Sequence, residues 1–482
     1  MAAIRLARAG ARVLLLEQGP AVGGKMGEVH ADGFRWDTGP SVVTMRHVLE
    51  ATYAAAGTRL ADELELVPVD PLTSYRWDDG TWLDLRADEE ATLAAIRAIE
   101  PRDVDGWRRY LARVAELHRI AGELFMYGDP PTPRTFLRIG PRDARTLAPW
   151  RTMASVIDEH LRSPYLRQVA ARFATYVGAS PYRAPAALNV IAHVELAGGV
   201  WYPRGGIHAI ARSLGGLAAG LGVEVRTGTR VERILVDGGR ATGVVLAGGA
   251  TERADGVVAN VDATLVARDL LPPGTVPRRR LARMLRAEPS LSGFILLLGT
   301  RAGAEPLGHH TICFSSDYRA EFRALFGDAR MADEPTVYLA MTAATDPDHA
   351  PTGHENPFVL VNAPAIVPGR PWDATAIARE RERVLDRLAR FGLDPRDRIV
   401  TERAITPADL AERTGAWRGA LYGRSSNAHL AAVERAPNAA REVGRLWLAG
   451  GSAHPGGGVP MVMLSGGRAA TLAAAELGLA PA

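Results

Sequence analysis

The stretch ARVLLLEQGPAVGGKMG, residues 11–27, places a short apolar run before an acidic residue and a glycine-rich loop. We expect a helix over Ala2–Ala9, ended by Gly10, and then a strand over Arg12–Leu16 that stops at Glu17. In a dinucleotide-binding unit this order follows a first strand and its phosphate loop. The acidic residue there accepts hydrogen bonds from the adenosine ribose. A solvated glutamate at a strand end is the alternative interpretation of Glu17.

The loop that follows favours close approach to a ligand. Gly23 and Gly24 have no Cβ to keep a phosphate or flavin away from the backbone. Lys25 is the only lysine in the chain and would offset a phosphate charge. The alternative is a glycine turn with a surface lysine, and GFRWDTGPS at residues 33–41 is by itself only a turn.

The C-terminal stretch LWLAGGSAHPGGGVPMV, residues 446–462, is the most informative. Five glycines lie within nine residues, directly before an expected helix. Backbone N–H groups of such a loop and of the helix N-terminus favour an electron-rich ligand. His454 in this loop invites a catalytic role, but a histidine that shapes the loop beside Pro455 is the favoured interpretation.

Composition excludes several classes of protein. A chain of 482 residues that is 47% hydrophobic has room for two or three domains. A net charge of +3 without a dense basic run argues against a nucleic-acid partner. The lone Cys313 forms no disulfide within the chain and fits a buried strand position in a reducing compartment. His309–His310 lacks a third ligand at useful spacing, so we expect surface or strand histidines and no metal site.

The organisation along the chain indicates an α/β fold with an insertion. Helical spacing dominates from about 46 to 190, a hairpin is expected at 230–249, and strands mix with helices from 263 to 440. Strands flanked by helices at both chain ends predict a discontinuous Rossmann-like domain that carries a second, α+β domain. No secretory signal or apolar run of about 20 residues is present, so the expected location is cytoplasmic, in solution or on a membrane surface.

Taken together, these stretches resemble the phytoene desaturase family of carotenoid desaturases, within the wider group of amine-oxidase-like flavoproteins. The resemblance covers nearly the whole chain. It rests on residues 14–45, on GGVWYPRGGIHAIARSL at 198–214, on GVEVRTGTRVERI at 222–234, and on GGSAHPGGGVPMVMLSGGRAA at 450–470. Residues 172–195 and 314–322 are more similar to the branch that acts on hydroxylated or neurosporene-type carotenoids.

The resemblance implies FAD. It implies an FAD-binding domain of residues 1–45, 197–262 and 440–482, and a substrate domain of residues 46–196 and 263–439. The ribose would be bound by Glu17, the pyrophosphate and ribityl chain by Gly23, Gly24, Lys25, Gly451 and Ser452, the adenine by the backbone of Val231, and the isoalloxazine ring by Val459, Pro460 and Met461.

The sequence departs from the family pattern at two places. Many related flavoproteins carry an acidic residue where Ser452 stands, although a hydroxyl also bonds a ribityl chain. Family members begin with a strand and a G-x-G-x-x-G loop, whose third glycine would fall just before Met1. The neighbours of that strand would be left unpaired, at roughly 1–3 kcal/mol for each buried group. We therefore expect the natural coding sequence to start upstream of Met1.

The implied reaction removes two hydrogens from a CH2–CH2 unit of a polyene, as a hydride to the flavin and a proton from the neighbouring carbon. Such a site needs an apolar tunnel more than paired carboxylates, and no catalytic residue is singled out. Oxygen or a quinone would reoxidise the flavin. The substrate lies in the bilayer, so a membrane surface is an expected partner, with residues 106–128 either an interfacial helix or a core-facing one.

Three other functions stay open. The same scaffold could support a carotenoid isomerase or oxygenase, which product identity would separate from a desaturase. The second is a carotenoid or isoprenoid binder that has lost its flavin. In this interpretation the departure from the family pattern at the N-terminus is a property of the protein itself. An amine oxidase is disfavoured by the GGGVPMV ending at 456–462.

Overall fold

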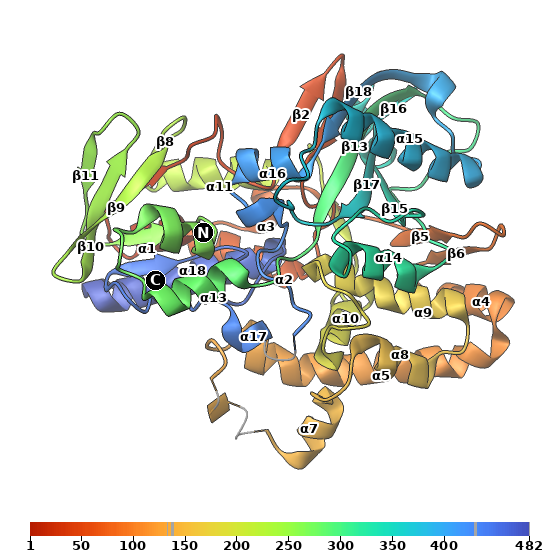
Figure 1. Ribbon diagram of the computed structural model, residues 1–482, viewed down its shortest axis with the longest axis horizontal. Helices are drawn as coiled ribbons and strands as arrows, with labels where there is room; N and C mark the ends of the chain where they lie inside the picture. The colour runs from red at the N-terminus through yellow and green to blue at the C-terminus, as the bar shows by residue number, and fades with distance from the viewer. Residues whose placement is uncertain (133, 136–138, 429–430, 482) are drawn as a thin grey trace.

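The computed structural model describes residues 1–132, 134–135, 139–428 and 431–481 (Figure 1). The predicted mixed α/β fold is confirmed, with the two ends of the chain side by side. Helix α1 (Ala2–Arg8) packs against α18 (Val459–Leu477), where Gly466 and Gly467 bring the two helices close together. The chain therefore closes on itself at the half that carries both glycine-rich loops.

The parallel strands of this half lie in two separate pairs. Strand β1 (Leu14–Leu16) pairs with β8 (Glu224–Arg226), and β12 (Val257–Ala259) pairs with β19 (Leu446–Leu448). Within the described ranges, neither β1 nor β12 has a second strand partner. Every residue of β1 and β12 lines the same cavity. The two pairs are not joined into one sheet in the described part of the chain.

The expected hairpin forms at Asp237–Arg240 and belongs to a three-stranded antiparallel meander, seen at the left of Figure 1. Gly238 and Gly239 both have positive φ, as a tight turn requires. Of the two short antiparallel pairs nearby, β2–β3 joins neighbouring segments, whereas β4–β7 joins segments distant in sequence. The strands are β2 (Glu28–Ala31), β3 (Phe34–Asp37), β4 (Leu66–Pro68), β7 (Trp201–Pro203), β9 (Val231–Asp237), β10 (Arg240–Leu246) and β11 (Thr251–Arg253).

An eight-stranded mixed sheet forms the second half. Its order is β16-β13-β17-β15-β14-β5-β6, and β18 also pairs with β13. The apolar runs predicted as strands supply its centre. The strands are β5 (Thr73–Arg76), β6 (Trp82–Leu85), β13 (Ser292–Arg301), β14 (His310–Cys313), β15 (Val337–Met341), β16 (His354–Glu355), β17 (Pro357–Ala363) and β18 (Ile399–Ile405).

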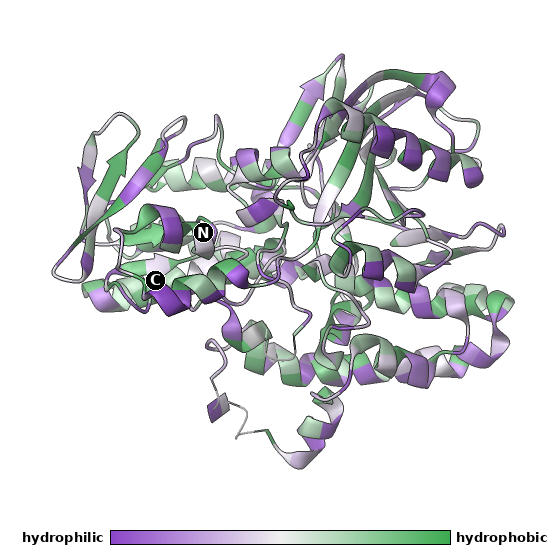
Figure 2. Ribbon diagram, in the orientation of Figure 1, coloured by the Kyte–Doolittle hydropathy of each residue, from purple (hydrophilic) through white to green (hydrophobic). Residues whose placement is uncertain are grey.

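Helix α15 (Ala374–Arg390) covers one face of this sheet. Its buried Val384, Leu385 and Leu388 pack on strand residues that include Cys313. Figure 2 shows hydrophilic residues along α15 and hydrophobic ones along β13 and β17. Since α15 covers only that face, residues on the other face are free to line the cavity described below.

A layer of helices lies below the sheet in Figure 1. Helix α5 (Val104–Ala121) buries Trp107, Tyr110, Val114 and Leu117, so the core-facing interpretation is correct for this helix and Trp107 is not an interfacial residue. No helix in the described ranges is long and apolar enough to cross a bilayer. The layer comprises α4 (Glu89–Ile99), α5 (Val104–Ala121), η2 (Gly122–Met126), α7 (Pro141–Leu147), α8 (Met153–His160), α9 (Pro164–Ala171), η4 (Ala186–Asn189) and α10 (Val190–Leu196).

The remaining helices connect these parts. Helix α2 packs on α1, α11 and α18, and α14 lies beside β15. The helices are α2 (Arg46–Ala56), α3 (Leu60–Glu63), α11 (His208–Gly220), α12 (Ala263–Leu265), α13 (Arg278–Arg286), α14 (Tyr318–Phe326), α16 (Pro407–Thr414) and α17 (Ala431–Glu434).

Candidate active site

One cavity of about 2200 Å³ joins both glycine-rich loops to the open face of the large sheet. Its walls come from segments hundreds of residues apart in sequence. All ten residues predicted to contact the cofactor line it: Glu17, Gly23, Gly24, Lys25, Val231, Gly451, Ser452, Val459, Pro460 and Met461.

The N-terminal loop is tightly held. The Glu17 carboxylate accepts the backbone N–H of Gly19 at 2.7 Å, which fixes the turn after β1. Gly23 and Gly24 have φ of +124° and +56°. A Cβ on Gly23 would lie 3.0 Å from that of Ala211 on α11, so a side chain there would be both strained and crowded.

Hydrogen bonds from Asn438 hold the C-terminal glycine-rich loop in place. The buried Asn438 amide donates to the carbonyl of His454 and to Ser465 Oγ, which in turn accepts the N–H of Gly450. The ring of His454 bonds the carbonyl of Gly128, and burial lowers its pKa. These contacts are those of a residue that shapes the loop, as favoured from the sequence.

The same loop approaches a buried ring. A Cβ on Gly457 would lie 2.7 Å from Tyr422 Cδ1. Ser452 Oγ accepts the N–H of Ala263, which leaves its hydroxyl proton available. The loop then enters α18, whose first residues, Val459–Met461, line the cavity.

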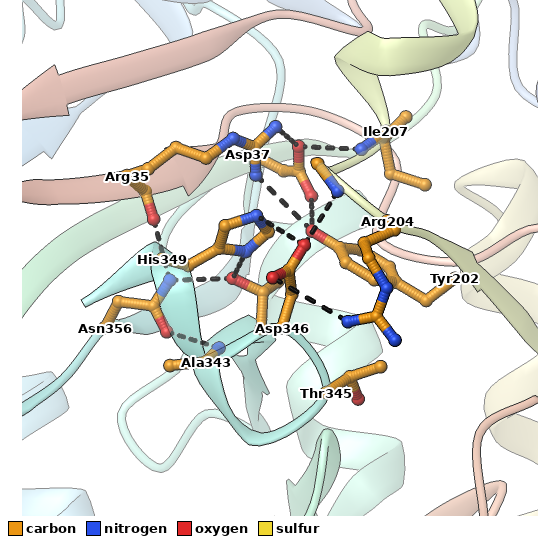
Figure 3. A network of polar contacts seen from close by, with 12 residues as sticks. Arg35, Asp37, Tyr202, Arg204, Ile207, Ala343, Thr345, Asp346, His349 and Asn356 are labelled. Carbon is orange, nitrogen blue, oxygen red and sulfur yellow. Dashed lines mark hydrogen bonds and ion pairs between the residues drawn. The ribbon is translucent and has the colours of Figure 1, made fainter. Parts of the chain in front are cut away.

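A buried polar network anchors the turn at Thr38–Ser41, which also lines the cavity (Figure 3). Asp37 accepts hydrogen bonds from Arg35 at 2.7 Å, from the Ile207 N–H at 3.0 Å and from the Tyr202 hydroxyl at 2.5 Å. At this turn a Cβ on Gly39 would lie only 1.7 Å from the carbonyl oxygen of Lys25. The network therefore holds two backbone segments together at a distance that only glycine permits.

The network continues to the large sheet. The amide of Asn356 donates to the Arg35 carbonyl at 2.7 Å and accepts the Ala343 N–H at 2.9 Å, and His349 lies 3.2 Å from Asp346 (Figure 3). His309 and His310 are both buried, so the surface alternative for this pair is wrong. His310 is instead on strand β14 and bonds the Tyr338 hydroxyl at 2.8 Å.

Burial sets the protonation of these two histidines. It lowers the pKa of His309 to about 3 and that of His310 well below its usual range. Both rings are therefore neutral at physiological pH. Among the described residues, no group of three histidine, cysteine or acidic side chains is arranged to hold a metal ion.

Strand alternation makes the far wall of the cavity. Side chains at alternate positions of the four central strands face it, while those between them face α15. The cavity-facing residues are Ile295, His310, Ile312, Thr336, Tyr338, Phe358, Leu360 and Asn362. Helical residues complete an apolar channel: Ala121, Phe125, Met126, Leu147, Leu188, Val190, Ile191 and Val194.

One buried ion pair interrupts this apolar wall. The Arg172 guanidinium pairs with Glu195, and their side chains are only 6% and 2% exposed. The Tyr176 hydroxyl donates to Glu195 at 2.5 Å and accepts from Arg172 at 2.9 Å. All three residues line the cavity.

Comparison with known proteins places this site in a family. Residues 1–474 match the family described as flavin containing amine oxidoreductase. The chain belongs to this family. It is 36% identical over 468 residues to a 4,4'-diapolycopene oxygenase from Methylomonas sp, covering 96% of this chain and 94% of the relative. It is 37% identical over 481 residues to a hydroxyneurosporene desaturase from Rubrivivax gelatinosus, covering 98% and 91%.

Solved structures of other oxidases share the fold of this flavin-containing amine oxidoreductase. Cyclohexylamine oxidase from Brevibacterium oxydans has a TM-score of 0.59 at 19% identity and covers 99% of this chain and 96% of its own. An oxidoreductase from Methanosarcina mazei has a TM-score of 0.63 at 16% identity and covers 96% and 95%. The family confirms the wider group of flavoproteins that the sequence resemblance implied.

The charges in the cavity fit the anionic part of a flavin cofactor. Lys25 donates to the carbonyls of Leu421 and Ala420, and burial lowers its pKa to about 8 against the opposing charge of Asp262. Arg435 donates to the Gly451 carbonyl, and burial lowers its pKa to about 10. Within the described ranges neither cation makes an ion pair with a carboxylate. Two partly buried cations beside a glycine-rich loop therefore favour an anionic ligand.

Sequence reasoning missed Arg435, Tyr422 and Asn438. Each contacts the C-terminal glycine-rich loop, through Gly457 for Tyr422, Gly451 for Arg435 and His454 for Asn438. Arg435 is one arginine among 57 lysines and arginines, so its residue type carries no signal. Asn438 lies 12 residues before Gly450, and that proximity was the only available indication.

Proposed function

We propose that this protein is an FAD-dependent carotenoid desaturase that introduces C=C bonds into a phytoene-, neurosporene- or hydroxycarotenoid-type polyene. One observation carries the proposal: a single cavity joins the glycine-rich loops to a long apolar wall. Soluble amines do not require such a wall, whereas a polyene buries its whole length against one. The two curated relatives described above are named for carotenoid substrates.

The proposed placement of FAD follows the loops. Glu17 binds the adenosine ribose, and Val231 borders the adenine. Gly23, Gly24 and Lys25, together with Gly451, Ser452 and Arg435, surround the pyrophosphate and ribityl chain. The start of α18, with Val459, Pro460 and Met461, lies against the isoalloxazine ring. Apart from Arg435, which lies in the range of the substrate domain, these residues belong to the proposed FAD-binding domain of residues 1–45, 197–262 and 440–482, together with the β9–β11 meander and the β1–β8 and β12–β19 pairs. The large sheet and the helical layer constitute the substrate domain.

FAD held by these residues would supply a two-electron oxidant for a hydride from an allylic carbon of the polyene, with oxygen or a quinone as the final electron acceptor. The protein's own contribution is alignment and exclusion of water. The apolar wall of Ile295, Phe358 and Leu360 holds the chain straight. A proton must leave the neighbouring carbon, so that one CH2–CH2 unit becomes CH=CH and a hydride and a proton are lost. The residue that receives this proton is not assigned.

An oxygenase is the second candidate, because relatives named oxygenases are 33–36% identical to this chain. It would insert oxygen at the polyene rather than remove hydrogen. Product mass separates the candidates. Loss of two hydrogens per step indicates a desaturase, gain of oxygen indicates an oxygenase, and unchanged mass with a changed spectrum indicates an isomerase.

We further propose that the protein takes its substrate from a membrane surface. The cavity is lined by Phe125, Met126, Leu147 and Pro149, and the chain exposes Tyr127 and Trp150 next to them, with side chains 41% and 67% exposed. Large exposed aromatic residues beside a channel suit the interfacial region of a bilayer. Trp150→Ala should lower sedimentation with anionic liposomes, whereas Trp82→Ala, which is 55% exposed on β6, should not.

The test of function combines cofactor and product. Purified protein is loaded with FAD and supplied with neurosporene-type and hydroxylated polyenes in liposomes under anaerobic and aerobic conditions. We expect visible flavin absorbance that bleaches on addition of polyene without oxygen, and a product with extended conjugation. Lys25→Met should weaken FAD binding at least about tenfold, since one buried cation is lost. A protein that binds polyene but never flavin would overturn the proposal in favour of a carotenoid binder.

A further inference from the structure

The end of the cavity against the large sheet is polar, although the strands around it are apolar. Along β17 the cavity-facing side chains are Phe358, Leu360 and Asn362, so an amide follows two large apolar groups. Thr336 lies opposite Asn362, since Val337 pairs with Val361 in the antiparallel register. Tyr318 of α14 lines the same end.

Two polar groups at this end have no protein partner. Within the described part of the chain, the Tyr318 hydroxyl makes no hydrogen bond, and neither does the side-chain oxygen of Asn362. The Tyr318 ring is fixed edge-on against Phe314 and Phe322, with ring centroids 5.4 and 5.0 Å away. Both residues line the cavity, so the two groups are accessible to a ligand held there and can take it as their hydrogen-bond partner.

Glu321 fixes the orientation of the amide. It lies one turn after Tyr318 on α14, and its carboxyl accepts the N–H of Thr336 at 3.1 Å and the hydroxyl of Thr336 at 2.6 Å. Its other oxygen accepts the Asn362 amide N–H at 3.5 Å. The Asn362 nitrogen is thereby directed to Glu321, and its oxygen is left as a free acceptor.

From this arrangement we infer that the sheet end of the cavity, at Tyr318 and Asn362, binds a hydroxyl group on one terminus of the polyene. The Tyr318 hydroxyl would donate to the substrate oxygen, and the substrate hydroxyl would donate to the Asn362 oxygen. A hydroxyl can accept from a donor and donate to an acceptor at the same time, as this donor and acceptor call for, whereas a carbonyl lacks the proton for Asn362. A carboxylate would be repelled by Glu321. This inference rests on the proposed function, because it assumes that a polyene occupies the cavity.

The test uses the flavin-loaded full chain and two acyclic polyenes of equal conjugated length. One carries a terminal hydroxyl and the other is the parent hydrocarbon. Dissociation constants come from quenching of tryptophan fluorescence, and kcat/KM comes from product formation. The variants are Tyr318→Phe and Asn362→Leu. The control is Tyr182→Phe, since Tyr182 packs edge-on against Phe322 and does not line the cavity.

We expect the wild-type protein to bind the hydroxylated polyene at least about tenfold more tightly than the hydrocarbon, since a site built for a hydroxyl discriminates against its absence. Tyr318→Phe and Asn362→Leu should each reduce this ratio to within about twofold while hydrocarbon binding is unchanged or tighter. Tyr182→Phe should keep the full ratio.

Two results would overturn the inference. The first is equal binding of both polyenes by the wild-type protein, as expected if ordered water serves Tyr318 and Asn362. The second is a variant that weakens both ligands equally, which would indicate a purely structural role. Failure of the proposed function has a different signature: no product forms from either polyene although the binding preference persists.

Discussion

Glu321→Gln tests how strongly the cavity end is desolvated. Burial raises the pKa of the Glu321 carboxyl to about 7 from 4.5, against the opposing hydrogen bonds from Thr336. An acid with a higher pKa in the folded chain binds its proton more tightly there than in the unfolded chain. Its ionisation therefore lowers the stability as the pH rises from about 4.5 to about 7, and this destabilisation stays constant at higher pH.

The size of the effect follows from these two pKa values. Linkage gives a destabilisation of about 1 kcal/mol near pH 5 and about 3 kcal/mol near pH 8. Glutamine does not titrate, so the variant should gain about 2 kcal/mol in unfolding free energy relative to wild type between these pH values. For a chain of this length that difference corresponds to about 2–3 °C in Tm.

The assay is thermal and urea unfolding of both proteins near pH 5 and near pH 8. Glu90→Gln is the control, because the Glu90 side chain is 77% exposed and should show no change between the two pH values. A Glu321→Gln effect that is the same at both pH values would refute the argument. It would mean that Glu321 ionises in the folded chain as it does in the unfolded one.

Gly39→Ala should destabilise the protein by about 1–3 kcal/mol and release flavin, because its Cβ would overlap the Lys25 carbonyl. Unfolding and flavin-content assays check both effects. Gly216→Ala, with open space around it, is the control and should show neither effect. Arg172→Met should lower the free energy of unfolding in urea by about 3–5 kcal/mol. The double variant with Glu195→Met should recover most of this loss, because no charge is then left unpaired. A double variant whose loss equals the sum of the two single-variant losses would contradict this. The Cys313 thiol, whose pKa burial raises to about 12, should react with a thiol reagent only after denaturation, and rapid labelling of the native chain would contradict its buried position.

The sequence predicted those features that depend on local pattern. The strand before Glu17, the hairpin at Asp237–Arg240 and the helix after Gly458 all form where apolar spacing and glycines indicate. Local pattern indicated four of the ten proposed cofactor contacts, Glu17, Gly23, Gly24 and Lys25, the family resemblance implied the full set, and the fold brings all ten to one cavity. Their individual roles stay predictions.

Long-range features were beyond local pattern. Nothing near Arg435 shows that its side chain reaches the carbonyl of Gly451 in a buried loop. Trp107 beside two arginines has the spacing of an interfacial helix as much as of a core helix, and only packing against the rest of the helical layer decides that it is buried. The His309–His310 pair likewise gave no sign of burial, because two histidines in sequence suit a surface as well as a strand.

The two faces of the large sheet have different roles, one in the stability of the core and the other in substrate specificity. Along β17, Val359, Val361 and Ala363 pack with α15, whereas Phe358, Leu360 and Asn362 line the cavity. Substitution at the second set changes what the cavity accepts and leaves the α15 interface intact, because neighbouring side chains point to opposite faces. A change at the first set acts on the core and reaches the cavity only by shifting the strand. Relatives with different polyene substrates should therefore differ more at the cavity-facing positions of β13, β14, β15 and β17 than at the positions between them.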